Sequence, residues 1–429
     1  MRPNTGTLWS SLIALAIGAT MFAGCGPKED AATTTGGDTA KTETTGGGSS
    51  SGGGETTGKG RPTPTAEGNK AEGATIKIGL VASLNGELKP WGDDCDKGAK
   101  LAIEEINAAG GINGKQIELL VEDSASKPEQ GKSATEKMIA AGALAIIGEV
   151  ASGITLQMAN SCFEKGVPIV AVGATRVDIT DIGSNVFRVC YTDDFQGPVM
   201  AKFAYEEKGL RKIALMTDKA QPYSTGLSDS FRKKFTELGG EIVDEQFYQS
   251  PQDKQFGPQL EKIKEKSPDG LFLSGYFTEV GAIARQSKEA GLKVVMLGGD
   301  GWDSTELNTS GGEAIVGGYF CNHYNNEEPR PEVQNFLKKW EAKYGGKPAT
   351  TMGALGYDAT MLVCDALKRA ATPDSKALTE AIENTENFAS VSGMITMKGN
   401  KGNPPKRALV VEVIPTGQKF AKAYEPGSL

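Results

Sequence analysis

The chain has 429 residues, with 46 basic and 54 acidic side chains and a formal net charge of −8. This length allows two or three domains of ordinary size, and mild acidity without a basic block argues against nucleic acid as a partner. A single histidine, His323, removes His-ligated zinc and the common histidine-based triads as the default chemistry. The composition therefore leans away from an enzyme, and no metal or cofactor is expected.

The first 25 residues have the layout of an export signal. Arg2 is the only charged side chain before Lys28, and the apolar stretch 8–23 runs into Phe22-Ala23-Gly24-Cys25. A basic start, an apolar segment and small residues before a cleavage point are typical of secretory signals. Because the small residues lead directly into a cysteine, residues 1–24 resemble a bacterial lipoprotein signal, which implies lipidation of Cys25. An uncleaved membrane helix is the alternative, since about 20 apolar residues can span a bilayer.

Residues 26–74 are predicted to be disordered. They contain 13 Gly and 11 Thr, and no Val, Ile, Leu, Met, Phe, Trp, Tyr or Cys. Such a segment has nothing to bury that would offset the chain entropy lost on folding. We therefore expect residues 25–74 to act as a tether that holds a soluble body, residues 75–429, off a membrane.

The body alternates short apolar strands with helical stretches. Residues 98–109 place Ala99, Ala102, Ile103 and Ile106 on one helical face, for example. This alternation implies βαβ units and parallel sheets, and about 355 residues of it favour two α/β domains over one. Strands are predicted at residues 75–82, 117–121, 144–148, 167–172, 212–217, 241–247, 270–274 and 293–297.

The loops after these strands contain candidate binding residues, because open α/β sheets bind ligands at the carboxyl ends of their strands. Ser152 precedes a helical stretch at 154–163, where its hydroxyl and free backbone N–H groups could hold a carboxylate, although it could also serve only as a helix cap. Gly173 and Thr175 could add backbone groups and a hydroxyl. Asp300, between two glycines, could pair with an ammonium group or be an ordinary turn residue.

Aromatic residues also follow the predicted strands. Trp91, Tyr223, Tyr276 and Trp302 all lie in such positions. Scattered aromatic side chains are usually core or rim residues, but gathered at one sheet edge they would wall an apolar pocket.

Residues 75–429 resemble the type I periplasmic binding proteins, specifically the leucine/isoleucine/valine-binding family of ABC importers. The resemblance implies two α/β lobes, each with a doubly wound parallel sheet, joined by a three-crossing hinge. It places lobe 1 at about 75–194 and 324–392, and lobe 2 at about 195–323 with part of 393–429. It rests on GAKLAIEEINAAGGINGKQIELLVED (98–123), IIGEVASGIT (146–155), PIVAVGAT (168–175), and SGYFTEVGAIARQSKEAGLK with GGDGWDS (between 274 and 304).

The resemblance also implies roles for individual residues. Ser152 and Thr175 would hold the α-carboxylate of an amino acid. The carbonyl of Gly173 and the hydroxyl of Thr175 would take its ammonium group, and Asp300 would close on that group from the second lobe. Tyr223 and Tyr276 would cover the ligand.

The side-chain pocket and the cysteines complete the comparison with this family. Trp91 would line the pocket, with Met352 near another pocket position. The best-known members have Glu where Asp300 stands, so the acid here reaches less far. Their disulfide is absent, because its cysteines align with Ser126 and Ala151. The sequence assigns no pairing to the cysteines of the body, which are Cys95, Cys162, Cys190, Cys321 and Cys364.

The function that the resemblance implies is a substrate-binding lipoprotein of an ABC importer. It would capture a free amino acid, branched-chain or otherwise apolar, and deliver it to permease subunits. It would be lipid-anchored in the cell envelope, in the periplasm or, in a cell with one membrane, on the outer face. Ligands such as an amide, urea or an aromatic acid remain alternatives, as does a ligand-sensing adaptor to a receptor. A hydrolase or transferase would need a nucleophile–base pair, for which we find no convincing candidate.

Overall fold

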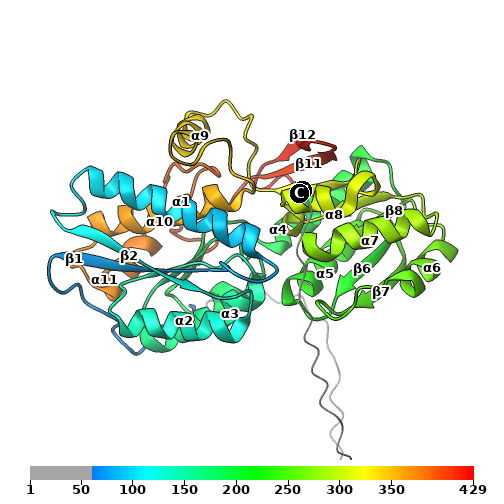
Figure 1. Ribbon diagram of the computed structural model, residues 1–429. Coiled ribbons are helices and arrows are strands. Elements are labelled where there is room, and N and C mark those ends of the chain that lie inside the picture. The colour runs from blue at the N-terminus through cyan, green and yellow to red at the C-terminus, as the bar shows by residue number, and fades with distance from the viewer. Residues whose placement is uncertain (1–59) are drawn as a thin grey trace, which may run out of the picture. The chain divides into compact units, whose positions relative to one another are not determined.

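The computed structural model describes residues 60–429 (Figure 1). The predicted signal at 1–24, the lipidation site Cys25 and the tether as far as residue 59 lie outside the described residues. Within residues 60–429, no helix combines the length and the apolar composition needed to cross a bilayer.

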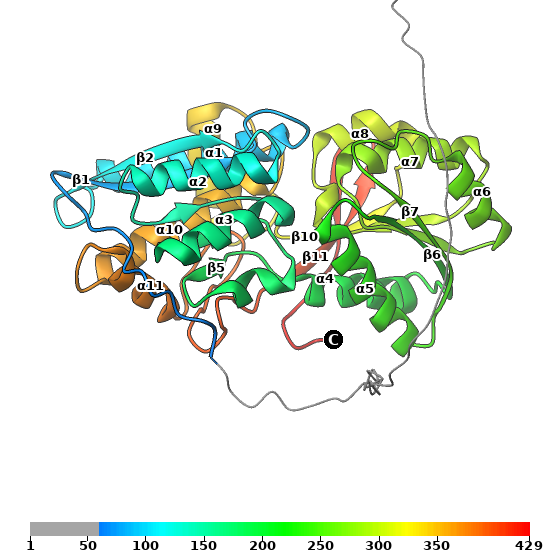
Figure 2. The same ribbon diagram turned by 90° about the horizontal axis from the view of Figure 1, so that it is seen from below.

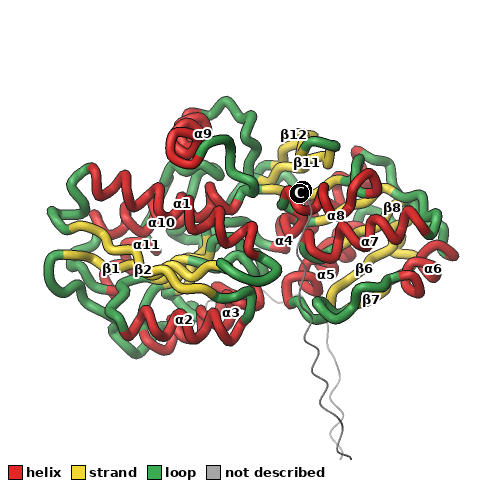
Figure 3. Tube along the Cα trace, in the orientation of Figure 1, coloured by secondary structure: helices red, strands yellow, loops and turns green. Residues whose placement is uncertain are grey.

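Lobe 1 is built on a five-stranded parallel sheet with the order β2-β1-β3-β4-β5. Helices α1 and α10 pack together on one face, and α2 and α3 cover the other (Figures 1 and 3). The strands are β1 Thr75–Ala82, β2 Gln116–Asp123, β3 Ile146–Ile147, β4 Ile169–Ala171 and β5 Val186–Arg188. The helices are α1 Lys89–Ala108, α2 Pro128–Ala140, α3 Ser152–Lys165, α9 Pro331–Tyr344, α10 Met352–Arg369 and α11 Ser375–Glu383.

Lobe 2 is built on a seven-stranded sheet with the order β12-β11-β10-β9-β8-β6-β7. Five of its strands, from β10 to β7 in this order, are parallel, and β11 and β12 add an antiparallel edge. The strands are β6 Lys212–Asp218, β7 Glu241–Tyr248, β8 Gly270–Leu273, β9 Val295–Gly298, β10 Tyr319–Asn322, β11 Ala408–Ile414 and β12 Gly417–Tyr424. The helices are α4 Asp193–Lys202, α5 Pro222–Glu237, α6 Gly257–Glu265, α7 Phe277–Glu289 and α8 Thr305–Gly311, with a short turn η3 at Asp300–Trp302.

The chain passes between the lobes three times: after β5, after β10 and before β11 (Figure 2). The expected fold class, two lobes with parallel sheets, is therefore confirmed, and the antiparallel edge of lobe 2 is an addition to it. Four strands are absent from the sequence prediction: the short strands β5 and β10, and the longer antiparallel pair β11 and β12. The predicted helix at 98–109 begins earlier, at Lys89.

The apolar strands form the core because both faces of each sheet are covered by helices. In lobe 2, for example, the rings of Phe231 on α5 and Phe272 on β8 stack 4.0 Å apart. In lobe 1, Gly98 allows α1 to approach α10 closely, since a Cβ there would meet the carbonyl oxygen of Gly353 at 2.0 Å. That close approach positions the first turn of α10, which faces lobe 2.

Residues 60–74 lie against lobe 1, which corrects the predicted extent of the disordered tether. The buried Arg61 side chain donates to the carbonyls of Gly183 (3.0 Å) and Val186 (2.6 Å) and pairs with Glu383. Asn69 donates to the carbonyls of Ile139 and Ala143. Polar side chains that bind backbone carbonyls order this arm, and a search for apolar residues alone could not reveal them.

Replacing Arg61 with Ala should lower the free energy of unfolding by about 2 kcal/mol, because buried carbonyls lose a charged donor. Urea denaturation measures this loss. Arg211→Ala is the matched control, since Arg211 is exposed and its side-chain bonds are local. Equal stability of the two variants would show that the arm does not contribute to the fold.

Candidate functional site

A narrow space lined by buried residues lies between the lobes. Six of the seven predicted site residues line it: Trp91, Ser152, Gly173, Tyr223, Tyr276 and Asp300. Met352, Val150 and Gly301 complete the lining. The seventh predicted residue, Thr175, is buried and does not line the space; Gln196 Nε2 links it to Asp300 through two hydrogen bonds. The structure therefore brings together residues that are up to about 260 positions apart in the sequence.

On the lobe 1 side, the space faces the beginning of α3. Ser152 is the first residue of this helix, and the N–H groups of its first turn have no helical carbonyl to bind. The Ser152 hydroxyl accepts a hydrogen bond from the backbone N–H of Arg176 (3.3 Å), which ties α3 to the loop after β4. A helix N-terminus with an adjacent hydroxyl is suited to hold an anion.

The carboxylate of Glu149 supports this turn from behind. It accepts from the N–H groups of Val150 (2.8 Å) and Ala151 (2.9 Å) and from the hydroxyls of Ser83 and Ser124. Burial raises the pKa of Glu149 above its usual value, and these hydrogen bonds act in the opposite direction. Glu149 therefore fixes the loop between β3 and α3.

In the loop after β4, Gly173 lets the backbone lie directly against the ligand space. A Cβ at Gly173 would lie 2.9 Å from the Met352 sulfur and from a Val150 methyl group, so only glycine fits there. The Thr175 carbonyl accepts from the N–H of Asp193 (2.9 Å), and its hydroxyl accepts from Gln196 (3.3 Å). This loop joins lobe 1 to the first chain crossing.

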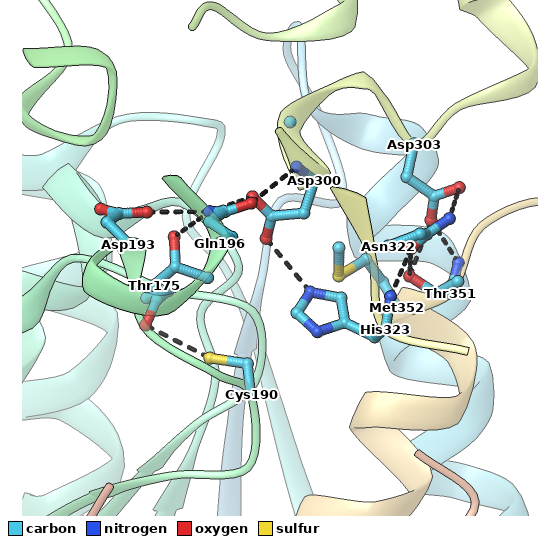
Figure 4. A network of polar contacts seen from close by, with 12 residues as sticks. Thr175, Cys190, Asp193, Gln196, Asp300, Asp303, Asn322, His323, Thr351 and Met352 are labelled. Atoms are coloured by element: carbon cyan, nitrogen blue, oxygen red, sulfur yellow. Dashed lines mark hydrogen bonds and ion pairs between the residues drawn. The ribbon is translucent and has the colours of Figure 1, made fainter. Parts of the chain in front are cut away.

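On the lobe 2 side, the Asp300 carboxylate lies in η3, directly after β9 (Figure 4). Its Oδ1 accepts from the Tyr223 hydroxyl (2.9 Å) and from Gln196 Nε2 (2.9 Å). Its Oδ2 lies 3.1 Å from His323 Nε2. Only 3% of Asp300 is exposed, so its hydrogen bonds must replace the water it loses.

Aromatic rings close the space. Trp91 lies in the first turn of α1, not in a loop, and meets the Tyr276 ring edge-on at 5.1 Å. Tyr223 and Tyr276 stack at 5.1 Å. Burial raises the pKa of both tyrosines well above its usual value, with the charge of Asp300 as a further cause, so both stay neutral. Trp302 instead packs in the core, where its indole N–H donates to the Leu273 carbonyl (2.9 Å).

Sequence reasoning missed Gln196, His323 and Asp193. Gln196 and Asp193 belong to α4, which follows β5, and His323 follows β10. Neither strand was predicted, so no strand end directed attention to these residues. His323 is the only histidine of the sequence, but no local pattern indicates that its ring contacts Asp300.

No Lys or Arg side chain lines the space formed by the described residues. The nearby buried Arg188 donates to the carbonyls of Ala174 (2.7 Å), Arg176 (2.8 Å) and Val177 (3.2 Å) instead. The polar character of the lining is thus divided: α3 offers hydrogen-bond donors to an anion, and Asp300 offers a carboxylate to a cation.

A second polar cluster joins the lobes beside this space (Figure 4). The Asp303 carboxylate of lobe 2 accepts from the N–H (2.5 Å) and hydroxyl (2.8 Å) of Thr351, which precedes α10 in lobe 1. It also accepts from Gln418 (2.7 Å) and Asn322 (3.1 Å), and the Asp303 carbonyl accepts from the Trp91 indole N–H (2.7 Å). Asp303 thereby links the two lobes, and it lies next to Asp300 and Met352.

The cysteines within residues 60–429 are buried and unpaired. Burial raises the pKa of Cys190 to about 12, so this thiol stays protonated. The described lobes therefore hold together through packing and hydrogen bonds, with no disulfide among these cysteines.

Comparisons with known proteins agree with this geometry. The family profile described as periplasmic binding protein matches residues 75–418. Leu/Ile/Val-binding protein homolog 3 of Brucella melitensis is 33% identical over 75% of this chain and 87% of its own length.

Solved structures share the fold. The leucine binding protein LivK of Thermotoga maritima is 35% identical, with a TM-score of 0.78 over 83% of this chain and all of its own. LivJ of Streptococcus pneumoniae, in complex with isoleucine, is 31% identical, with a TM-score of 0.77 over 82% of this chain and all of its own. A solute binding protein of R. palustris, in complex with benzoate, is 25% identical, with a TM-score of 0.73 over 82% of this chain and 97% of its own.

Replacing Asp303 with Asn should lower the free energy of unfolding by about 2–4 kcal/mol, because an amide nitrogen would face donors that now bind a carboxylate. The lobes should also separate more often, so the radius of gyration from small-angle X-ray scattering should rise. Asp365→Asn, at an exposed i,i+4 ion pair, is the control. If both variants unfold and scatter alike, Asp303 does not hold the lobes together.

Proposed function

The chain belongs to the periplasmic binding protein family, and we propose that it is the substrate-binding component of an ABC importer that captures a free amino acid. The proposed ligand has a branched or otherwise apolar side chain. The names of its relatives, a Leu/Ile/Val-binding homolog and a leucine binding protein, support this ligand class. A binding protein of this kind captures and releases its ligand without changing it chemically.

One observation carries the proposal: the buried space has an anion-binding end and an acidic end. The first turn of α3 with Ser152 lies on lobe 1, and Asp300 lies on lobe 2. An α-amino acid carries a carboxylate and an ammonium group on one carbon and can satisfy both ends at once. Thr175 and the Gly173 carbonyl would complete the contacts of these two groups.

The remaining lining suits an apolar side chain. Trp91, Tyr276, Val150 and Met352 are aromatic or apolar residues of this lining. No Lys or Arg stands among them, so the side-chain end of the space offers no partner to an acidic side chain.

Closure of the lobes supplies the binding mechanism. Ser152 and Thr175 on lobe 1 would bind first, and Asp300 with Tyr223 and Tyr276 would then close from lobe 2. A ligand that contacts both lobes binds the closed form more tightly than the open form and so shifts the population toward closure. The closed form buries the charged ends of the ligand among their partners, and opening returns them to water.

An aromatic carboxylic acid is the second candidate, because the R. palustris relative was solved with benzoate. Such an acid brings a negative charge and no ammonium group. It would leave Asp300 without a cation in a space that no Lys or Arg lines. Urea and simple amides lack both charges. The ionic character of the lining therefore favours the amino acid. A sensory adaptor would bind the same ligand between the same lobes, so the lining does not distinguish that role from import.

The cell-envelope location of this component is proposed from the sequence. Residues 1–24 would be removed as a signal, Cys25 would carry lipid, and the segment up to the ordered arm at residue 60 would tether the lobes to the membrane. ABC permease subunits at that membrane would receive the amino acid.

Globomycin, which blocks lipoprotein signal cleavage, should cause the uncleaved chain to accumulate, whereas Cys25→Ser should remove lipid labelling.

A thermal-shift screen tests the ligand class. The chain, freed of bound ligand, should melt at a higher temperature with Leu, Ile or Val, since a ligand that binds only the folded state stabilises it by mass action. Benzoate and urea at the same concentrations should leave the melting temperature unchanged. A shift with benzoate and none with any amino acid would overturn the proposal in favour of the second candidate.

Replacing Asp300 with Asn should weaken amino-acid binding by about 100-fold, because the ammonium group loses its charged partner in a buried site. Isothermal titration calorimetry measures the affinity, and circular dichroism checks the fold. Asp229→Asn is the control, since Asp229 is exposed in an ion pair with Arg232. Unchanged affinity in Asp300→Asn would remove Asp300 from the ligand site.

A further inference from the structure

We propose that Asp193 is a second acid of the ammonium site, which acts through Gln196 and couples amino-acid binding to the release of a proton. This inference rests on the proposed function, because it needs a ligand with an ammonium group. Asp193 does not line the ligand space, so it is a positioning residue: it acts on the ligand through Gln196 and Asp300.

The geometry joins two carboxylates through a single amide. Gln196 Nε2 lies 2.8 Å from Asp193 Oδ1 and 2.9 Å from Asp300 Oδ1, with the Thr175 hydroxyl at 3.3 Å (Figure 4). The amide oxygen of Gln196 accepts from the N–H of Asp300 (3.1 Å). An amide nitrogen has only two hydrogens for these three acceptors. The charge states of Asp193 and Asp300 are therefore directly linked.

The two acids differ in their partners. Asp300 accepts from Tyr223 and Gln196, and its Oδ2 lies 3.1 Å from His323 Nε2. Asp193 is 1% exposed, and within the described residues its Oδ2 has no hydrogen-bond partner. The Asp193 carboxylate therefore has an oxygen that could carry a proton without breaking a hydrogen bond.

Within residues 60–429, no Lys or Arg side chain forms a hydrogen bond or ion pair with Asp193. Arg188, on β5, donates its terminal N–H groups to backbone carbonyls, and Arg176, after β4, donates to Asp178 and to the Pro222 carbonyl. On its outer side Asp193 lines a pocket that also holds Lys233 and Lys234 of α5 and several carboxylates. Further titratable groups near Asp193 are neutral or acidic. They are Cys190 after β5, Tyr223 on α5, Tyr276 before α7 and Asp300 in η3.

The pKa of Asp193 agrees with this geometry. Burial, followed by the negative charge of Asp300, raises it to about 7, while hydrogen bonds from Gln196 and Thr175 and the charge of Arg188 act to lower it. Near neutral pH, Asp193 in the ligand-free closed form is therefore able to exchange a proton with solvent. An ammonium group beside Asp300 offsets the charge that opposes ionisation, so the pKa of Asp193 falls and the proton leaves.

The direction of the pH dependence follows. Below about pH 7 the free site must lose a proton to bind, so affinity should rise with pH and then level off. Between pH 5.5 and 7.5 the ligand keeps a protonated amino group and an ionised carboxyl group, so it does not titrate itself. The ligand-free chain should show the opposite trend in stability, because a raised folded-state pKa stabilises the fold at low pH and this contribution disappears as pH passes through 7.

Calorimetry with L-leucine, in two buffers of different ionisation enthalpy, tests the inference. At pH 6.5 the wild-type chain should release up to one proton per leucine, and its affinity should rise about tenfold from pH 5.5 to 7.5. Asp193→Asn should release none and show a flat profile. Asp194→Asn, at the exposed neighbouring position, should behave as wild type.

The ligand-free melting temperature gives a second readout. It should fall from pH 5.5 to 8 in the wild-type chain and fall less in Asp193→Asn. Binding of leucine without proton release, or an identical pH profile in Asp193→Asn, would overturn the inference and leave the proposed function intact. Absence of binding by leucine and by every other α-amino acid would overturn both.

Discussion

The buried carboxylate of Asp300 is the constraint on which the rest of the site depends. A charge removed from water is costly unless donors surround it. Those donors come from α4 through Gln196, from α5 through Tyr223 and from the end of β10 through His323. These elements are far apart in the sequence, so the charge is stable only when lobe 2 is fully assembled. The same donors hold the carboxylate in one orientation, toward lobe 1.

The turn that carries Asp300 is held in place by the residues that follow it. Trp302 is buried in the core of lobe 2, and Asp303 binds Thr351 of lobe 1. The contact between the lobes therefore lies only three residues from Asp300, the proposed partner of the ammonium group. A ligand that binds Asp300 and the beginning of α3 adds to contacts that Asp303 and Trp91 already make between the lobes.

The sequence predicted those parts of the fold that have strong local signals. Strands such as Thr75–Ala82 are rich in apolar residues. Ser152 and Asp300 each follow a strand of this kind, so each was expected at the carboxyl edge of its own parallel sheet. β5 has only three residues, and its existence depends on pairing with β4. Because β5 was missed, so was Gln196. The hydrogen bond between Gln196 and Asp300 forms only in the folded chain, so no local sequence pattern predicts it.

The ordered arm, residues 60–74, is bound to lobe 1, so lobe 2 can move without disturbing it. Arg61 binds carbonyls next to β5 and Glu383 of α11, and Asn69 binds carbonyls that follow α2 and the end of that helix. All of these partners belong to lobe 1. Opening of the lobes therefore changes none of these hydrogen bonds, and lobe 2 can move without displacing the arm. Movement of lobe 2 instead breaks the contacts of Asp303 with Thr351 and of Arg176 with the Pro222 carbonyl, which lie on the lobe boundary. The polar contacts that hold the lobes together thus lie around the ligand space, away from the arm.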